Sequence, residues 1–214
     1  MIPEFPKTLH LHQVDDSILS SESLFVEEKV DGANCGMALI DDHPVIRNRT
    51  HVLNKGYVKK NTPAKLQFRP AWNWFYKNKK KFEQLESFGS LALYGEWLWA
   101  LHGIHYDKLP DWFIVYDIYE RDTERYLSPS HRRAILNPIG FTSIPLLHKG
   151  PITQEELQDL CQQPSVYSSS DQREGVYLKT GDDFYTLDRC KLLREGYVQG
   201  CNWNEKEIVK QKLK

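Results

Sequence analysis

Six short runs rich in β-branched and aromatic residues constrain the fold of this 214-residue chain more than any other feature of its sequence. Runs of this composition, separated by turn-forming residues, are typical of β-strands. They occupy residues 24–30, 35–40, 91–101, 112–119, 175–179 and 184–193. Short polar turns join two pairs of them, Asp-Gly-Ala-Asn in one case and Thr-Gly-Asp-Asp in the other. Turns of this length predict hairpins, so we expect antiparallel sheets.

Helical patterns lie between these runs and do not alternate with them regularly. Residues 71–86 fit a helix that begins after Pro70, and residues 129–136 and 153–162 fit shorter helices. Residues 204–214 predict a short basic helix at the C-terminus. Because strand hairpins and helices are mixed without a βαβ repeat, we expect an α+β fold of antiparallel sheets flanked by helices.

The composition favours one globular domain that spans residues 1–214. The chain is 40% hydrophobic and 27% charged, and a chain of this length can bury a sizeable core. No stretch approaches the roughly 20 apolar residues that a membrane span needs. The N-terminus carries prolines and charges instead of the apolar run of a signal peptide. We therefore expect a cytoplasmic monomer with no membrane association.

Neither the cysteines nor the histidines form a metal-binding pattern. The four cysteines, Cys35, Cys161, Cys190 and Cys201, include no CxxC pair, so we expect free thiols in a reducing compartment. His102 and His105 have the spacing HxxH but no obvious third ligand, which favours a structural role for both.

Charge is distributed very unevenly along the chain. Residues 1–42 carry a net charge of −7, whereas residues 43–82 contain eleven Lys and Arg residues and no acid. Aromatic residues are interleaved with these cations: Tyr57, Phe68, Trp72, Trp74, Phe75 and Tyr76. The pattern predicts a surface that follows a phosphate backbone and stacks on bases. The alternative is a solvated basic helix face whose aromatic residues are buried in the core.

A lysine at the end of the first strand-like run is the strongest candidate for chemistry. Lys29 stands in EEKVDGAN, before Asp31 and Gly32. It could be a surface charge or a nucleophile held against a nucleotide phosphate, and the Lys-x-Asp-Gly pattern alone is weak evidence. Further short motifs follow it in order: Arg49 in NRTH, Glu96 in YGEW, Tyr116 in VYDI, Glu174 in REGVYLK, and Arg189 with Lys191 in DRCK.

In this order the motifs resemble those of the covalent nucleotidyltransferase superfamily of polynucleotide ligases and capping enzymes. The resemblance is specifically to ATP-dependent RNA ligases of the RNA ligase 2 type. It runs from Lys29 to Lys191 and so covers most of the chain. The implied fold is an ATP-grasp-like ligase adenylation domain, that is, a nucleotidyltransferase domain.

The resemblance also implies a role for each motif residue. Lys29 would be the adenylated nucleophile, Arg49 would contact the ribose and phosphate, and Tyr116 would stack on the base. The remaining assignments are nucleotide binding for Glu28, Asn34 and Glu96, metal binding for Glu96 and Glu174, and catalysis for Lys191 and Arg189. Arg189 departs from the family pattern, which has lysine there, and Asp31 stands where several close RNA ligases have histidine.

The implied reaction uses ATP and Mg²⁺ or Mn²⁺. A phosphorus centre surrounded by negative oxygens needs a neutral attacking amine, nearby cations and hard oxygen ligands for a metal. The implied partners are RNA ends, in a nicked duplex or a broken RNA, with an end-processing kinase or phosphatase to prepare them.

Two other interpretations of the motifs remain open. DNA ligases and capping enzymes share the motif order but usually carry an OB-fold domain after the last motif. Because 23 residues follow Lys191, we expect no OB-fold domain in this chain. A noncatalytic nucleic-acid-binding homologue is the other alternative, and the intact lysines and glutamates of the motifs count against it.

Overall fold

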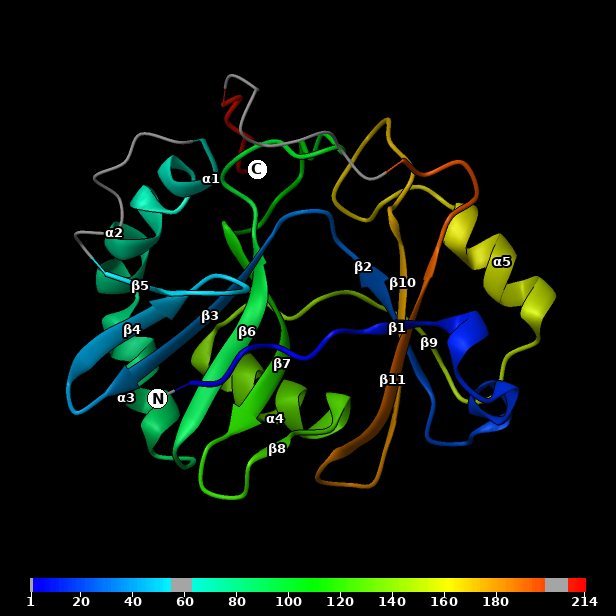
Figure 1. Cartoon of the computed structure of the whole chain (residues 1–214), viewed down its shortest axis with the longest axis horizontal. Helices are drawn as coiled ribbons and strands as arrows, with labels where there is room; N and C mark the ends of the chain where they lie inside the picture. The colour runs from blue at the N-terminus through cyan, green and yellow to red at the C-terminus, as the bar shows by residue number, and fades with distance from the viewer. Residues whose placement is uncertain (1, 55–62, 199–207) are drawn as a thin grey trace.

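Two β-sheets that face each other form the centre of the molecule (Figure 1). The computed structural model describes residues 2–54, 63–198 and 208–214. A five-stranded sheet has the strand order β1-β11-β10-β2-β9, and a six-stranded sheet has the order β5-β4-β3-β6-β7-β8. Neighbouring strands pair antiparallel, except that β1 and β11 are parallel.

The strands have the following bounds. In the five-stranded sheet they are β1 Leu9–His10, β2 Phe25–Lys29, β9 Leu146–Lys149, β10 Gly175–Gly181 and β11 Thr186–Leu193. In the six-stranded sheet they are β3 Ala33–Ile40, β4 His43–Arg47, β5 Val52–Leu53, β6 Leu91–Trp97, β7 Phe113–Glu120 and β8 Arg125–Tyr126. The α+β class and the antiparallel sheets expected from the sequence are confirmed.

Helices cover the outer face of each sheet. Their bounds are α1 Pro63–Leu66, α2 Arg69–Lys77, α3 Lys79–Glu86, α4 Pro129–Ile139 and α5 Gln154–Gln162, with 3₁₀ turns at Leu11–Gln13 and Asp16–Ser20. Side chains alternate along a strand, so Cys35 and Met37 of β3 share a core with Phe75 and Phe82 of the helices. Asn34, on the opposite face of β3, therefore points away from α2 and α3.

The predicted helix over residues 71–86 is wrong in one respect, because it is interrupted at Asn78. The backbone of Asn78 leaves the helical region, with φ −101° and ψ 9°, between α2 and α3. Its Nδ2 donates a hydrogen bond to the Trp74 carbonyl at 2.9 Å. A short polar side chain that competes for helix carbonyls favours such a break.

Residues 208–214, the described part of the predicted C-terminal helix, are not helical. Residues 204–207 lie outside the described residues, and residues 208–214 are extended, with Lys210 and Leu213 in isolated β-bridges. The strand expected over residues 91–101 also ends earlier, at Trp97. The segment after Trp97 instead makes contacts with the extended C-terminal residues.

Aromatic side chains of the basic segment mostly belong to the core. Phe68, Trp74 and Phe75 are at most 7% exposed and pack beneath the six-stranded sheet. Tyr76 is exposed, and Tyr57 lies outside the described residues. The structure therefore favours a basic helix face with buried aromatic residues over an array of stacking platforms.

The N-terminal segment connects the two sheets across the front of the molecule (Figure 1). Arg47 of the six-stranded sheet donates to the Ile2 carbonyl at 2.9 Å, and Tyr94 of the same sheet donates to the Pro3 carbonyl. A few residues later β1 joins the edge of the five-stranded sheet beside β11. Residues 4–8 consequently pass over the space between the sheets.

The expectations about membrane spans and free thiols can be compared with the described residues. None of the helices in this part of the chain is long and apolar enough to cross a membrane. Cys35, Cys161 and Cys190 are free, buried thiols, whereas Cys201 lies outside the described residues.

Candidate active site

A cavity of about 200 Å³ lies between the two sheets, under the N-terminal segment. Most of the predicted motif residues line it, together with residues from the N-terminus and from β10 and β11. The lining residues are Phe5, Pro6, Thr8, Lys29, Gly32, Asn34, Arg49, Glu96, Glu174, Tyr177, Lys191 and Leu193.

Lys29 is held at the cavity wall by an ion pair with Glu174. It is the last residue of β2 and lies opposite Gly175 of β10, which places Glu174 beside it. Lys29 Nζ is 2.6 Å from Glu174 Oε1 and 5.4 Å from the centre of the Tyr177 ring. A Cβ atom at Gly175 would lie 2.2 Å from the Leu192 carbonyl oxygen, so only glycine allows β10 and β11 to approach this closely.

The charge of Lys29 is stabilised despite its burial. Burial alone would lower its pKa, but Tyr177, Glu174 and Glu96 outweigh that effect and hold the pKa above its ordinary value. The amine therefore carries a proton at neutral pH, and it must lose this proton before it can attack a phosphorus centre.

Two buried carboxyl groups face Lys29 in the cavity. Burial, the neighbouring Glu174 and Asp31 raise the pKa of Glu96 to about 8, and burial also raises the pKa of Glu174. The Oε2 atoms of Glu96 and Glu174 are buried and have no hydrogen-bond partner among the described residues. Buried oxygens without partners are costly, so this pair is suited to receive a cation.

Their chemistry fits a divalent metal ion. Mg²⁺ and Mn²⁺ prefer oxygen ligands, and Mg²⁺ usually takes one or two carboxylates together with substrate phosphates and waters. Within the described residues no group of three or more His, Cys, Asp or Glu side chains forms a complete cage. The two carboxylates therefore suit a metal that is bound together with a phosphate substrate.

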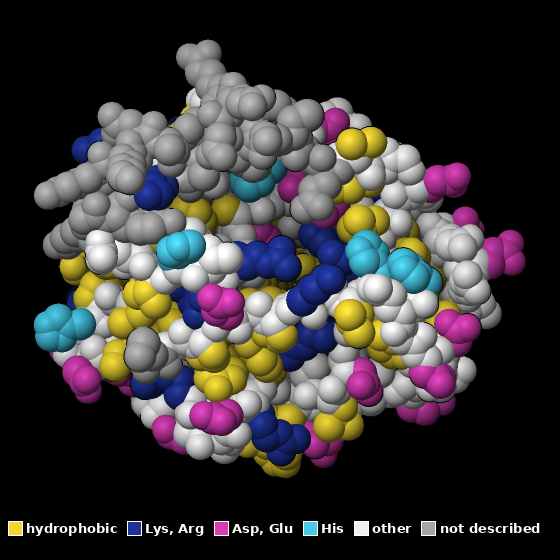
Figure 2. Space-filling model, in the orientation of Figure 1, with side chains coloured by type: hydrophobic (Ala, Val, Ile, Leu, Met, Phe, Trp, Pro, Cys, Tyr) yellow, Lys and Arg dark blue, Asp and Glu magenta, His cyan; other side chains and the backbone are white. Residues whose placement is uncertain are grey.

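Cations surround the mouth of the cavity. Arg49 follows β4, and Lys191 lies on β11 directly opposite His10 of β1. Lys7, Arg49 and Lys191 form no ion pair with any described residue. Burial and then the nearby Lys29 lower the pKa of Lys191, and Glu174 opposes this effect only in part. Figure 2 shows Lys and Arg side chains gathered near the centre of this face, with His side chains beside them.

Asn34 and Tyr116 form a pair at the back of the site. Asn34 lines the cavity, and its Nδ2 donates a hydrogen bond to the Tyr116 hydroxyl. Tyr116 itself is 1% exposed, with its ring packed edge-on against Phe5 at a centroid distance of 4.9 Å. In this structure Phe5 and Tyr177, and not Tyr116, present aromatic surface to the cavity.

Glu28 and Arg189, like Tyr116, are predicted site residues that lie outside the cavity. Glu28 points to the opposite side of β2 from Lys29, and its carboxylate accepts hydrogen bonds from Ser165 Oγ at 2.5 Å and from the Val166 amide at 3.0 Å. The alternation of side chains along a strand explains this placement. The structure therefore does not bring Glu28 to the predicted nucleotide site.

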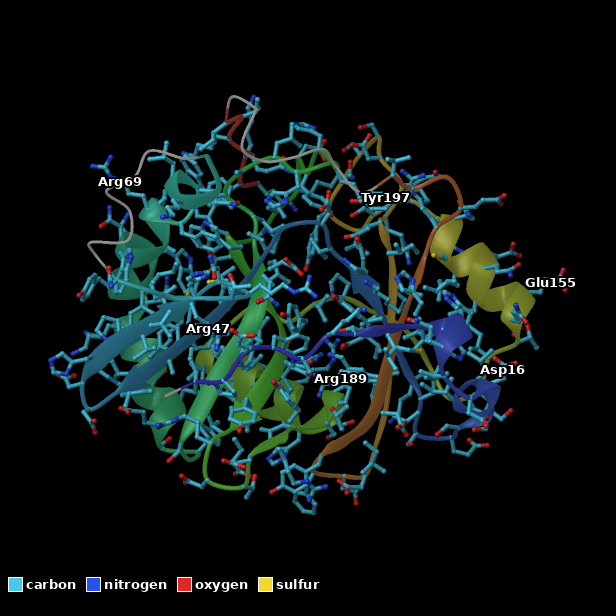
Figure 3. All side chains as sticks on the ribbon, viewed as in Figure 1. Asp16, Arg47, Arg69, Glu155, Arg189 and Tyr197 are labelled. Carbon is cyan, nitrogen blue, oxygen red and sulfur yellow. The ribbon has the colours of Figure 1, made fainter. Side chains whose placement is uncertain are left out.

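Arg189 lies on the same face of β11 as Lys191 but further from the cavity. Its Nη1 is 3.1 Å from Asp117 Oδ2, and its guanidinium lies 4.1 Å from the centre of the Tyr126 ring. In Figure 3 the labelled Arg189 lies between the two sheets. Arg189 is thus separated from Lys191, its predicted partner, and is bound to the six-stranded sheet.

Sequence reasoning missed the N-terminal contribution and Tyr177. Tyr177 could have been found, because it shares a strand with the predicted motif and lies two residues from Gly175 on the same face. Phe5, Pro6 and Thr8 carried no local signal, since only the tertiary path of the N-terminal segment places them over the cavity.

The two facing sheets, with a buried lysine, two carboxyl groups and surrounding cations between them, define a nucleotidyltransferase-type domain. The RNA ligase family model matches residues 22–196, and the chain belongs to this family. No curated protein matches the chain at a significant level.

Solved structures of an RNA ligase from Naegleria gruberi share the fold. The structure with PPi has a TM-score of 0.67 at 22% sequence identity, over 92% of this chain and 57% of that one. A mutant with ATP and Mn has a TM-score of 0.69 at 23% identity, over 91% and 58%. A mutant with AMP and Mn has a TM-score of 0.65 at 21% identity, over 92% and 57%. This chain spans somewhat more than half the length of those proteins.

Proposed function

We propose that residues 1–214 act as the nucleotidyltransferase domain of an ATP-dependent RNA ligase. The observation that carries the proposal is the ion pair of Lys29 and Glu174, 2.6 Å apart, in a cavity shared with Glu96, Arg49 and Lys191. An amine, two hard carboxylates and unneutralised cations in one cavity are what lysine adenylation requires.

In the first step Lys29 loses its proton to solvent and its nitrogen attacks the α-phosphorus of ATP. A nitrogen–phosphorus bond forms while the bond to the bridging oxygen breaks, and pyrophosphate leaves. Arg49 and Lys191 would bind the phosphate oxygens, and cationic neighbours lower the pKa of the attacking amine. In-line displacement directs the leaving group away from Lys29, toward the cations at the cavity mouth.

A divalent metal fits the two carboxylates, and the Naegleria structures with ATP and Mn support its use here. Glu96 and Glu174 would hold it. When bound, the metal would neutralise charge on the phosphate oxygens. These carboxylates must be ionised for that role, so the raised pKa of Glu96 implies that metal binding displaces a proton.

The remaining steps join RNA ends. AMP passes from Lys29 to an RNA 5′-phosphate, and a 3′-hydroxyl then attacks that phosphate and releases AMP. Membership of the RNA ligase family supports RNA as the substrate. Because the reaction consumes ATP, we assign it to the cell interior, as the sequence predicts. We also retain the expectation that a kinase or phosphatase prepares the ends.

The test is incubation with α-labelled ATP or GTP and Mg²⁺, followed by a denaturing gel. We expect a labelled adduct with ATP that is acid-labile and is reversed by pyrophosphate. Lys29→Ala should abolish it, whereas Lys108→Ala, which removes an exposed lysine, should not. Labelling from GTP instead of ATP would favour a capping-type enzyme, and an unchanged band in Lys29→Ala would exclude Lys29 as the nucleophile.

A further inference from the structure

The extended C-terminal segment, residues 208–214, packs against the loop that follows β6. Backbone hydrogen bonds join Leu101 to Val209 at 2.8 Å, Gln211 to Trp99 at 3.0 Å and Lys214 to Leu109 at 2.9 Å. This segment lies outside residues 22–196, the part of the chain that the family model matches. The family match therefore does not extend to the C-terminal side of these contacts.

Gln211 is the buried centre of this contact. It is 1% exposed, although the residues on either side of it are exposed. Its Oε1 accepts a hydrogen bond from the Tyr106 amide at 3.0 Å, and its Nε2 donates to the Ile104 carbonyl at 2.7 Å. One side chain therefore fixes two backbone positions of the loop, and both hydrogen bonds are shielded from water.

The same short loop holds Asp31, which is two residues beyond Lys29. The Gly103 and Ile104 amides donate to Asp31 Oδ2 at 2.6 Å and 3.2 Å. The Asp31 amide in turn donates to the Tyr106 hydroxyl at 2.7 Å. A Cβ atom at Gly103 would lie 2.9 Å from Asp31 Oδ2, so the close approach depends on glycine.

Residues 103–106 thus form a bridge between Gln211 and Asp31. Ile104 and Tyr106 each contact both of them, through different groups. Tyr106 is 0% exposed, Ile104 3% and Asp31 8%, so each end of the bridge is buried. A displacement of this loop would be transmitted to Asp31, because hydrogen bonds with Gly103, Ile104 and Tyr106 hold both its carboxylate and its backbone amide.

We propose that Gln211 is a positioning residue for lysine adenylation, acting through residues 103–106 and Asp31 on the strand end that carries Lys29. The inference rests on the proposed function. Attack on the α-phosphorus needs the amine in line with the leaving group, and displacements of about 1 Å can cost about a hundredfold in rate. Gln211 touches neither Lys29 nor the cavity, so its effect is on the rate of attack and not on nucleotide binding.

Three variants test this connection. Gln211→Ala removes both side-chain hydrogen bonds of Gln211. Tyr106→Phe removes only the hydroxyl that accepts the hydrogen bond from the Asp31 amide. The matched control is Lys212→Ala, an exposed change in the same segment. Single-turnover formation of the Lys29 adduct at saturating ATP should slow by about tenfold in each of the first two variants. The double variant should be no slower than either one, because both act through the same bridge.

Two further measurements distinguish positioning from loss of folding. ATP affinity, measured by equilibrium binding, should change by less than about twofold in Gln211→Ala, because this side chain does not line the cavity. A twofold change corresponds to well under 1 kcal/mol of binding free energy. Wild-type adduct rates in folded Gln211→Ala, or multiplied effects in the double variant, would overturn the proposal.

Hydrogen exchange tests the bridge without any chemistry. In Gln211→Ala the amides of residues 103–106 and of Asp31 should exchange faster, and in Lys212→Ala they should not. Unchanged exchange at Asp31 would overturn the proposal even if wild type forms the adduct. Faster exchange at Asp31 in a protein that forms no adduct would show the bridge and would refute the proposed function instead.

Discussion

At the residue scale, Arg189 and Lys191 differ in their surroundings although they stand two positions apart on one strand. Lys191 lines the cavity, whereas Arg189 pairs with Asp117 and lies over the Tyr126 ring. A guanidinium can pair and stack at the same time, which an ammonium does less well. The contacts with the six-stranded sheet are therefore ones that an arginine at position 189 suits better than a lysine.

Substitution of Arg189 should affect mainly stability, and substitution of Lys191 should affect mainly adduct formation. Arg189→Ala should lower the free energy of unfolding by about 1–3 kcal/mol, because a largely buried carboxylate loses a charged hydrogen-bond donor. Lys191→Ala should leave unfolding nearly unchanged but slow adduct formation by about a hundredfold, since it removes a cation beside the phosphate. Urea unfolding and single-turnover labelling of both variants measure this. A stable Arg189→Ala protein that fails to form the adduct would contradict this division of roles between Arg189 and Lys191.

At the element scale, the N-terminal segment completes the site and also brings charge to it. Lys7 and His10 lie beside Lys191, and burial together with Lys191 lowers the pKa of His10. His10 also stacks on His12 at a centroid distance of 5.5 Å. Since the leaving pyrophosphate should emerge at this end of the cavity, Lys7 is placed to bind it as a cation and His10 as a neutral hydrogen-bond donor.

The combined Lys7→Ala and His10→Ala variant should bind pyrophosphate more weakly. We expect the pyrophosphate concentration that half-maximally reverses the Lys29 adduct to rise about tenfold, the effect of about 1.4 kcal/mol of lost binding. Sealing of RNA that already carries a 5′-adenylate should be unaffected, because that step involves no pyrophosphate. Lys108→Ala is the control. If only the sealing step slows, Lys7 and His10 serve the RNA and not pyrophosphate.

Helix α3 contains the densest run of lysines but lies across the sheet from the cavity. Its Phe82 packs with Cys35 and Met37, whereas Asn34 on the opposite face of β3 lines the cavity. Lys79 also pairs with Asp42 at 2.6 Å, and Lys81 donates to the Gly140 carbonyl at 2.7 Å. These lysines are therefore separated from the predicted chemistry by the sheet and its core.

Salt dependence of RNA binding tests that placement. Replacing Lys79, Lys80 and Lys81 together with alanine should leave the slope of log K against log salt unchanged. Arg49→Ala, which removes a cation that lines the cavity, should reduce the slope by about 0.7–0.9, the effect of one lost phosphate contact. A reduction of about two or more in the triple variant would show that α3 contacts the nucleic acid after all.

Elements that depend on residues close together in the sequence could be predicted, whereas elements that depend on tertiary contacts could not. The hairpin of β10 and β11 and the helix after Thr153 were predictable, because the turn residues and the capping box of Thr153 and Glu156 are local signals. The extended residues 208–214 were not predictable, since they depend on contacts with the segment after Trp97. The break at Asn78 was missed, although asparagine is itself a local signal because it competes for helix carbonyls. Of the candidate site, the motifs brought together Lys29, Glu96 and Glu174. Glu28 was misplaced although its position next to Lys29 puts it on the other face of the strand. Arg189 was misplaced because spacing along a strand does not show what faces the side chain.

At the scale of the whole molecule, a buried ion-pair network joins the two sheets beside the cavity. Glu27 of β2 pairs with Arg132 and Arg133 of α4, and it lies 3.3 Å from Lys179 of β10. Lys179 also lies 3.0 Å from Asp117 of β7. The network therefore fixes the five-stranded sheet against the six-stranded sheet, and with it the relative positions of Lys29 and Glu96.

Glu27 makes this network sensitive to acid. Burial alone would raise its pKa, but Arg132, Lys179 and Arg133 outweigh burial and lower the pKa to about 2 from an ordinary value of 4.5. Because the folded state holds this proton more weakly than the unfolded state, the stabilisation is fully present above about pH 4.5 and is lost as the pH falls toward 2. The contribution at neutral pH is on the order of 3 kcal/mol.

Glu27→Gln should remove both the stability and its acid dependence. At neutral pH the variant should lose about 3–5 kcal/mol of unfolding free energy, because Arg132 and Lys179 remain buried without their carboxylate. The difference between wild type and Glu27→Gln, measured by urea unfolding, should shrink as the pH is lowered below 4.5. Glu155→Gln, an exposed change on α5 (Figure 3), should track wild type throughout. A difference that stays constant with pH would mean that Glu27 is not ionised in the folded protein, and the sheets would then have to be held together by packing and by the ion pairs of Asp117 with Lys179 and Arg189.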